Sequence, residues 1–232
     1  MGVFWCVEIH LKRSILGAYM DTAGKLFGGT SRVKVMRLFL LNKESTFTTK
    51  DVRDRSKITA SQATKELNFL YSIGFLKKKA IPSKTKTKKV KSKKKKSKKA
   101  PATSKKYQYF FNENFVYKNA LEEILIEKDS VSRKDMAGKF KRAGRVKTLV
   151  VSGVFLKDND NDIDMLVVGD NLKKNIVDRI ISDIEADMGT EISYAVFDTE
   201  EFLYRASMRD KLIADVFDFP HEFIIDGLKL ST

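Results

Sequence analysis

The feature that most constrains the fold is a pair of short apolar runs separated by an acidic loop. The runs cover residues 149–151 and 165–168, within the stretch LVVSGVFLKDNDNDIDMLVVG. Both contain β-branched residues and neither is interrupted by a polar residue, which is typical of strands buried on both faces. Strands of this kind require other elements on each side. The sequence therefore predicts a sheet with helices packed against it.

The loop between the two runs carries four aspartates at alternate positions, which are Asp158, Asp160, Asp162 and Asp164. If Asp162 begins the second strand, the side-chain period of two points Asp162 and Asp164 to the same face, about 7 Å apart. Two carboxylates in that arrangement suit a divalent metal ion such as magnesium. The alternative is a turn at the entry to the strand, in which both acids are solvated.

These residues resemble the signature of the nucleotidyltransferase superfamily, in which a Gly-Ser turn precedes an acid, an apolar residue and a second acid. Here Ser152 and Gly153 follow the first run, and Asp162 and Asp164 flank Ile163 before the second. The resemblance covers about residues 133–226. It implies a mixed sheet with flanking helices, nucleotide binding at Ser152 and Gly153, and catalysis by Asp162 and Asp164 with bound magnesium.

The sequence departs from that signature at two points. Ser152 and Gly153 stand in the reverse order, and Ser193 occupies the position where the family has a third carboxylate. Glu191, two residues earlier, is the candidate replacement. We therefore expect a domain that has lost catalysis and that binds a ligand such as a nucleotide or mediates assembly. The alternative is an active enzyme that uses magnesium to transfer a nucleoside monophosphate to a protein or RNA hydroxyl.

The order of elements predicted for this second domain is mixed. Apolar and polar periodicity predicts helices over residues 133–142, 172–188 and 200–215. Short apolar runs predict strands over residues 146–151, 163–168, 192–197 and 223–225. This order favours an α/β-like arrangement of one sheet with flanking helices.

The positive charge of the chain is concentrated in one segment. The formal net charge is +15, and residues 77–106 contain sixteen lysines and no acidic residue, so the rest of the chain carries −1. Such a tract binds polyanions without sequence preference, with an affinity that falls steeply with salt. Residues 82–106 are also predicted to be disordered, because Ser, Thr, Lys and Pro bury too little apolar area to fold. The alternative is therefore an insertion that only improves solubility.

The segment before the lysine tract has the pattern of three helices. The first begins near residue 30, where Ser31 can cap it. The pair Thr48-Thr49 caps the second, which covers residues 50–56. The third begins at Thr59 or Ser61 and is ended by Gly74. The tight turn between the second and third helices predicts a helix-turn-helix.

Residues 75–78 and 107–111 have the pattern of two strands on either side of the lysine tract. A helix-turn-helix followed by such a ribbon resembles the winged-helix transcriptional regulators of the ArsR-like or MarR-like kind, over about residues 26–128. The phrases QATKEL at residues 62–67 and SIGFL at residues 72–76 carry the resemblance. It implies a regulator of transcription that binds double-stranded DNA.

The third helix of such a regulator enters the major groove with its polar face. The residues predicted to be buried are Ala63, Leu67, Leu70 and Ile73. The candidate DNA contacts are Thr59, Ser61, Gln62, Thr64, Lys65 and Asn68, and the candidate phosphate contacts in the lysine tract are Lys93, Lys94, Lys95 and Lys96. The alternatives are a solvated helix face and a helix-turn-helix that docks on protein.

A helical connector is predicted over residues 112–129, with an apolar side made by Val116, Leu121, Ile124 and Leu125. This side can pair with a second copy, because regulators of this class commonly bind DNA as dimers. Packing within one chain explains the same pattern. A homodimer is therefore one of two expectations.

Composition excludes several kinds of site. Cys6 is the only cysteine, and His10 and His221 are far apart, so we expect no internal disulfide, no ArsR-like metal site and no structural zinc. Charged residues interrupt the apolar residues 3–20, so we expect neither a membrane span nor a signal peptide, and a cytoplasmic location.

The predicted protein is α+β, with an α/β-like C-terminal half. Its domains cover residues 26–128 and 133–226, with a tail over residues 227–232. Residues 1–25 form an N-terminal extension, in which residues 1–19 match no clear element and Met20 is an alternative start. The expected function is DNA-binding transcription regulation, with the second domain inactive as an enzyme.

Overall fold

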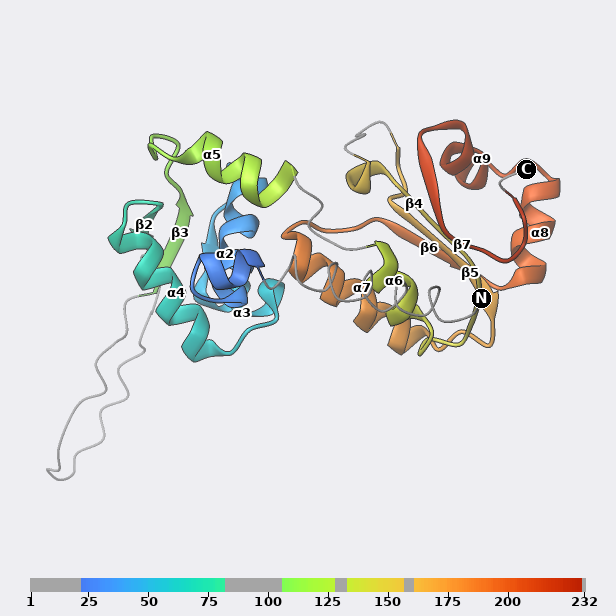
Figure 1. Ribbon diagram of the computed structural model, residues 1–232, viewed down its shortest axis with the longest axis horizontal. Helices are drawn as coiled ribbons and strands as arrows, with labels where there is room; N and C mark the ends of the chain where they lie inside the picture. Colours follow the sequence, from blue (N-terminus) through green and yellow to red (C-terminus); the bar gives the residue numbers. More distant parts are fainter. Residues whose placement is uncertain (1–21, 82–105, 128–132, 157–160, 231–232) are drawn as a thin grey trace, which may run out of the picture.

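The computed structural model describes residues 22–81, 106–127, 133–156 and 161–230. The protein is α+β, and its helices accompany two separate sheets (Figure 1). A three-stranded antiparallel sheet belongs to the N-terminal half, and a four-stranded mixed sheet belongs to the C-terminal half. Among the described residues, no helix has both the length and the apolar character needed to cross a membrane.

Between residues 30 and 111, the described part of the N-terminal half contains three consecutive helices and a three-stranded sheet. The helices are α2 (Thr30–Leu41), α3 (Thr49–Ser56) and α4 (Ala60–Ser72), and the strands are β1 (Phe47–Thr48), β2 (Leu76–Ala80) and β3 (Tyr107–Phe111). Strand β3 lies between β1 and β2, with Leu76 opposite Phe111. The predicted pairing of the two strands that flank the lysine tract is therefore confirmed.

Local side-chain chemistry fixes the starts of α3 and α4. Thr48 and Asp51 form a reciprocal capping box at α3, and Thr59 and Gln62 form one at α4. Each box satisfies backbone N–H groups that the first turn of a helix leaves without a partner. The predicted cap at Ser31 is wrong, because Gly29 precedes α2 and no side chain caps that helix.

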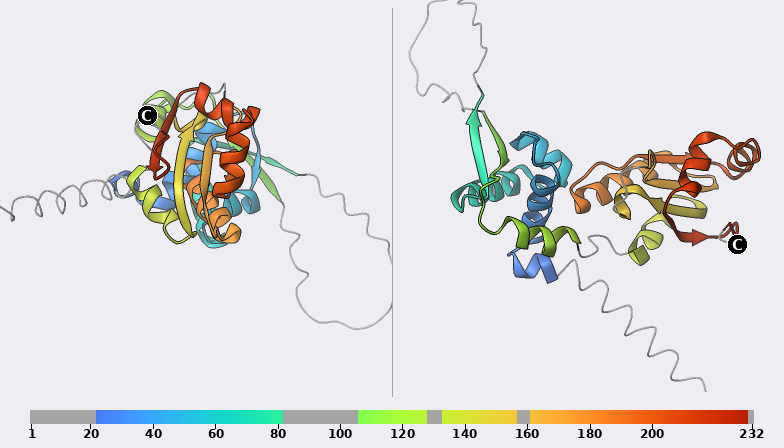
Figure 2. Two further views of the ribbon diagram at one scale, coloured as in Figure 1. Left: turned by 90° about the vertical axis from the view of Figure 1, so that its right-hand side faces the viewer. Right: turned by 90° about the horizontal axis from the view of Figure 1, so that it is seen from above.

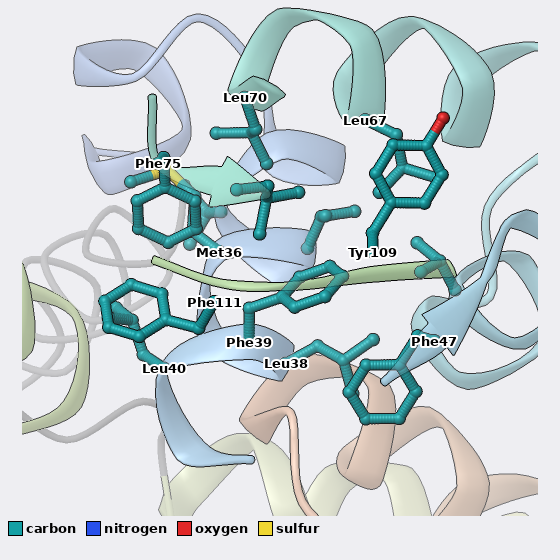
Figure 3. Close-up of a cluster of buried hydrophobic side chains, with 14 of the residues drawn as sticks. Met36, Leu38, Phe39, Leu40, Phe47, Leu67, Leu70, Phe75, Tyr109 and Phe111 are labelled. Atoms are coloured by element: carbon teal, nitrogen blue, oxygen red, sulfur yellow. The ribbon is translucent and has the colours of Figure 1, made fainter. Parts of the chain in front are cut away.

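One continuous apolar core holds the N-terminal half together (Figure 3). Phe39 of α2 packs edge-to-face on Phe47, with 5.3 Å between the ring centroids. Ala63, Leu67 and Leu70 of α4 are fully buried, as predicted. Ile73 is 46% exposed, because it follows the last residue of α4 and no longer faces the core.

The connector after the hairpin contains a short helix, α5 (Lys118–Glu122), and a π-helical turn, η1 (Glu123–Glu127). Leu125 is fully buried in the N-terminal core and Leu121 packs against that core. Val116 is 87% exposed and Ile124 is 46% exposed. The predicted single apolar side is therefore wrong, because two of its four members pack within the chain and the other two face away.

The C-terminal half forms one sheet with helices on both faces. The helices are α6 (Arg133–Phe140), α7 (Lys174–Met188), α8 (Thr199–Ser207) and α9 (Lys211–Asp218), and η2 (Gly153–Phe155) is a 3-10 turn. The strands are β4 (Arg145–Ser152), β5 (Met165–Asp170), β6 (Tyr194–Phe197) and β7 (His221–Asp226), in the order β6-β5-β4-β7. Strand β4 is antiparallel to β5 and β7, and β5 is parallel to β6.

Alternate residues of the central strands enter two different cores. Leu149 and Val167 belong to the core with α6 and α7, whereas Val150 and Val168 belong to the core with α8 and α9. Figure 2 gives two further views of these layers. The prediction that both apolar runs are strands buried on each face is confirmed.

The last predicted helix is wrong as a single element. Residues 199–218 form two helices, because the chain turns at Arg209, where φ is 51°, and Asp210 caps α9. The side chain of Asp210 accepts a hydrogen bond from the backbone N–H of Leu212.

The two halves pack together through α2, α3 and the C-terminal end of α7. Lys34 of α2 and Lys139 of α6 both pair with Asp187 of α7, at 2.8 and 3.3 Å. The side-chain amide of Asn42 donates a hydrogen bond to the backbone carbonyl of Gly189 at 2.8 Å. Polar contacts therefore connect the N-terminal half to the C-terminal end of α7, which packs against the four-stranded sheet.

Candidate functional site

The outer face of α4 is the first candidate site. All six predicted contact residues on this helix and its cap are exposed to solvent. They are Thr59, Ser61, Gln62, Thr64, Lys65 and Asn68. The C-terminal half packs against α2 and α3. The β2–β3 hairpin lies beside α4, on the side of the molecule away from the four-stranded sheet (Figure 1).

Three of these residues already make local hydrogen bonds. The side-chain oxygen of Gln62 accepts hydrogen bonds from the backbone N–H and the hydroxyl of Thr59, both at 3.0 Å. The hydroxyl of Thr64 donates to the backbone carbonyl of Ala60 at 2.9 Å. Thr59, Gln62 and Thr64 therefore stabilise the first turns of α4. The start of the helix at Thr59 was one of two predicted positions, but the roles of Gln62 and Thr64 were not predicted.

The remaining three residues have their polar groups available. Within the part of the chain that the structure describes, Ser61, Lys65 and Asn68 make no side-chain hydrogen bond and no ion pair. Lys65 and Asn68 lie three positions apart on a helix, so they are neighbours on its surface. The free groups among the predicted contacts on α4 are therefore a hydroxyl, an ammonium group and a carboxamide.

Strand β2 adds three lysines that were not among the predicted site residues. The ammonium group of Lys78 lies over the rings of Tyr71 and Tyr107, at 4.0 and 5.1 Å from their centroids. Lys77 and Lys79 are exposed on the opposite face of the strand, because successive side chains alternate. The sequence signal that could have marked Lys77, Lys78 and Lys79 as site residues is their position at the start of the lysine tract. Lys93, Lys94, Lys95 and Lys96 lie outside the described residues.

The second candidate site is the turn that follows β4. Its 3-10 turn begins at Gly153, where φ is 52°, and a side chain at that position would collide with the carboxylate of Asp164. The hydroxyl of Ser152 donates to the backbone carbonyl of Ile163. Ser152 and Gly153 are both buried, so these contacts hold the turn closely against the segment before β5.

Asp164 is an internal acceptor at this turn. The residue is 7% exposed, and its Oδ1 accepts a hydrogen bond from the backbone N–H of Val154 at 2.8 Å. Its Oδ2 accepts one from the backbone N–H of Ser193, also at 2.8 Å. Each oxygen therefore satisfies a backbone donor, and the carboxylate connects the turn after β4 to the segment before β6.

Asp162 does not lie beside Asp164 on a strand. Strand β5 begins at Met165, the two acids precede it in a bend, and Asp162 is exposed while Asp164 is buried. The expectation that both carboxylates share one strand face is therefore wrong. The bend exists because Asp164 turns inward to accept hydrogen bonds from Val154 and Ser193.

Glu191 belongs to a different part of the surface. Its side chain is 76% exposed and pairs with Arg55 of α3. Across residues 22–81, 106–127, 133–156 and 161–230, no three His, Cys, Asp or Glu side chains are placed to hold a metal ion together. Glu191 therefore does not complete a set with Asp162 and Asp164, while Asp158 and Asp160 lie outside the described residues.

The sequence matches no protein-family model, and no curated protein and no solved structure matches it.

Proposed function

We propose that the protein is a regulator of transcription that binds double-stranded DNA with a winged-helix domain. In this proposal α4 enters the major groove, and the β2–β3 hairpin follows the phosphate backbone. The observation that carries the proposal is the open polar face of α4, on which Ser61, Lys65 and Asn68 have no partner among the described residues. Side chains of these three types read base edges or contact phosphates.

The arrangement around α4 supports the proposal. The side of α4 that carries Leu67 and Leu70 is anchored in the core, so the helix presents its polar face from a rigid support. The capping box of Thr59 and Gln62 fixes its first turn. The N-terminal part of a recognition helix is the part that contacts bases in helix-turn-helix proteins.

Charge supplies the attraction to DNA in this proposal. Lys77 and Lys79 are exposed on β2, and the chain between β2 and β3 is rich in lysine. Each phosphate contact releases condensed counterions, so binding weakens as salt rises. We therefore assign phosphate contact to the hairpin and base contact to α4.

The C-terminal half is proposed as a nucleotidyltransferase-like domain without catalysis, which binds a ligand or mediates assembly. The support is that Asp164 is buried and accepts a backbone N–H on each carboxylate oxygen, whereas Asp162 is exposed, so the two acids do not form a pair that could hold a metal. The ion pair of Glu191 with Arg55 removes the third candidate acid. Magnesium has no role in this proposal, and pairing with a second copy stays a prediction.

The test is direct binding of the full chain to duplex DNA. Fluorescence anisotropy with a pool of labelled genomic fragments should give a dissociation constant for the unmodified protein. The double variant Lys65→Gln, Asn68→Ala should lose preference for the selected fragments, by about 1–3 kcal/mol for each base contact removed. Lys211→Gln removes one exposed lysine from α9 in the other half and is the matched control.

Salt dependence separates the two kinds of contact. Lys77→Gln with Lys79→Gln should weaken binding to all duplexes alike, and the slope of log affinity against log salt should fall by about 0.9 for each phosphate that is no longer neutralised. Equal affinity and equal preference for the unmodified protein and both double variants would refute the proposal.

A further inference from the structure

A group of exposed cations lies at one end of the four-stranded sheet. Residues 139–147, from the end of α6 into β4, contain five cationic side chains and no acid, and the segment that leads into α7 adds Lys173 and Lys174. Outside the lysine tract the chain carries a net charge of −1, so this gathering of cations is a local feature of the C-terminal half. We call Lys141, Arg142, Lys173 and Lys174 the basic patch.

Backbone contacts hold together the two loops that carry the basic patch. The backbone N–H of Lys173 donates a hydrogen bond to the carbonyl of Ala143 at 2.7 Å. Gly144 has a φ of 136°, and a Cβ there would lie 2.6 Å from the backbone oxygen of Asn171. Glycine allows the loops to approach this closely. The basic patch is therefore one surface, carried by two loops whose backbones touch.

The charge of the basic patch is not neutralised by neighbouring side chains. All four of its residues are exposed, and among the residues that the structure describes their side chains form no ion pair and no hydrogen bond. Lys139 and Lys147 differ, because they pair with Asp187 and Asp170. The patch therefore presents four free positive charges to solvent.

Acids at the same end of the sheet belong to the opposite layer. Asp198 and Glu200 follow β6 and begin α8, whose Phe202 is buried in the core on one face of the sheet. Phe140 of α6 and Val177 of α7 belong to the core on the other face. The basic patch lies on the side of α6 and α7, so these acids do not offset its charge directly.

The form of the basic patch indicates the class of partner. Small ligands bind in concave sites that surround them. Four exposed cations spread over two loops instead suit a polyanion, whose phosphates repeat along its length. In Figure 1 the starts of α4 and α7 both lie along the lower edge of the molecule, so the basic patch is on the same side as the proposed recognition helix.

We propose that the basic patch contacts phosphates of the same DNA duplex, beyond the site covered by α4 and the β2–β3 hairpin. This inference rests on the proposed function. The C-terminal end of α7 packs on α2 and α3, and the basic patch lies at its start, about 22 Å away for a helix of 15 residues. A duplex advances by about 3.4 Å for each base pair, so the patch reaches DNA roughly six or seven base pairs beyond the N-terminal half.

The experiment is fluorescence anisotropy of the full chain with two labelled duplexes of about 12 and about 30 base pairs, both centred on a site selected from the genomic pool. The double variant Arg142→Gln, Lys173→Gln removes one charge from each loop. Its affinity for the longer duplex should fall about threefold or more, and the slope of log affinity against log salt should fall by about 0.9 for each lost phosphate contact. Its affinity for the shorter duplex should stay unchanged.

The matched control is the double variant Arg209→Gln, Lys211→Gln. It also removes one arginine and one lysine, both exposed, from the turn before α9 and the start of that helix, which lies at the upper edge of the molecule in Figure 1. Its binding to both duplexes should equal that of the unmodified protein. Equal melting temperatures for the two double variants exclude a damaged fold.

Two outcomes would overturn the inference and leave the proposed function intact. One is equal binding of the longer duplex by the patch variant and the control, while Lys65 and Asn68 still provide a preference among duplexes. The other is an equal loss on both duplexes at an unchanged melting temperature, which would place the contact within the short site. If no protein binds either duplex, the proposed function fails and the inference fails with it.

Discussion

The guanidinium of Arg37 donates a hydrogen bond to the backbone carbonyl of Asp187 at 2.9 Å, across 150 positions of the chain. Arg37 is 4% exposed, and its Nε also donates to the backbone carbonyl of Leu125 at 2.9 Å. Burial lowers the pKa of Arg37, and the nearby carboxylate of Asp187 raises it in part. One buried side chain therefore joins α2, the connector and the end of α7.

Arg37→Met should lower the free energy of unfolding by about 2–4 kcal/mol. The variant keeps the apolar stem but leaves the carbonyls of Leu125 and Asp187 without this donor, and unsatisfied buried acceptors are costly. Urea unfolding followed by circular dichroism measures the change.

Lys34→Met is the control, because Lys34 pairs with the same Asp187 from a partly exposed position and Lys139 remains as a partner. Its cost should stay below about 1 kcal/mol. Equal losses in the two variants would contradict a special role for the buried guanidinium.

Gly189→Ala should disrupt the packing of the two halves. A Cβ at Gly189 would lie 2.7 Å from the backbone carbon of Arg37 and from the backbone nitrogen of Leu38, and the φ of 87° disfavours a side chain. We expect a loss of at least about 2 kcal/mol and faster hydrogen exchange in α2 and at the end of α7.

Gly138→Ala provides the matched control for that glycine. It lies within α6, and a Cβ there would meet no atom within 4 Å. Alanine is the better helix former, so this variant should be more stable by about 0.4–1 kcal/mol. Unchanged hydrogen exchange in α2 and at the end of α7 in Gly189→Ala would contradict the prediction that a side chain at this position disrupts the packing of the two halves.

Asp164→Asn tests whether Asp164 is structural. Asparagine has one side-chain oxygen, so its NH₂ group would face the backbone N–H of either Val154 or Ser193. The expected loss is about 1–3 kcal/mol, measured as a lower melting temperature. The control is Asp162→Asn. Because Asp162 is exposed, this variant should change stability by no more than about 0.5 kcal/mol. Equal melting temperatures for the two variants would contradict the structural role.

The capping box of α3 should make stability depend on pH in the acid range. The hydrogen bond from the backbone N–H of Thr48 lowers the pKa of Asp51, with further lowering by the Thr48 hydroxyl and by Arg55 and Lys50, while burial raises it in part. A lowered folded pKa means that the stabilising contribution is present above the unfolded value, about 3.9. It is lost as the pH falls through the folded pKa.

Asp51→Asn should therefore destabilise the protein at neutral pH and lose less stability than the unmodified protein between about pH 5 and pH 2. Urea midpoints at a series of pH values provide the comparison. Parallel curves for the two proteins would show that the cap does not contribute to the acid dependence.

Local signals made much of the fold predictable. Thr48 and Thr59 mark helix starts through chemistry that acts within three residues, and residues 149–151 and 165–168 mark strands through burial on both faces. Such signals depend on neighbouring positions, so they survive without knowledge of the tertiary structure.

Long-range contacts were not predictable in the same way. The two aspartates before β5 have the spacing of a strand, but Asp164 turns inward because it accepts hydrogen bonds from Val154 and from Ser193, 29 positions away. Arg37, in the apolar phrase VMRLFLL, was the visible sign of a buried polar contact. Its acceptor, the backbone carbonyl of Asp187, lies 150 positions away and has no local sequence signal, so the pattern does not predict the junction of the two halves.

Gln62 separates helix stability from DNA recognition. Its side-chain oxygen accepts from the N–H and the hydroxyl of Thr59, so Gln62→Ala should lower stability by about 0.5–2 kcal/mol. Gln62→Glu retains an oxygen acceptor and should restore most of that loss, because an acid also suits the first turn of a helix. If Gln62 acts only in the cap, both variants should keep the preference among duplexes that Lys65 and Asn68 provide. Thermal unfolding and anisotropy on the same preparations give the comparison. A lost preference in Gln62→Ala, at a temperature where the variant remains folded, would assign base contact to Gln62 instead.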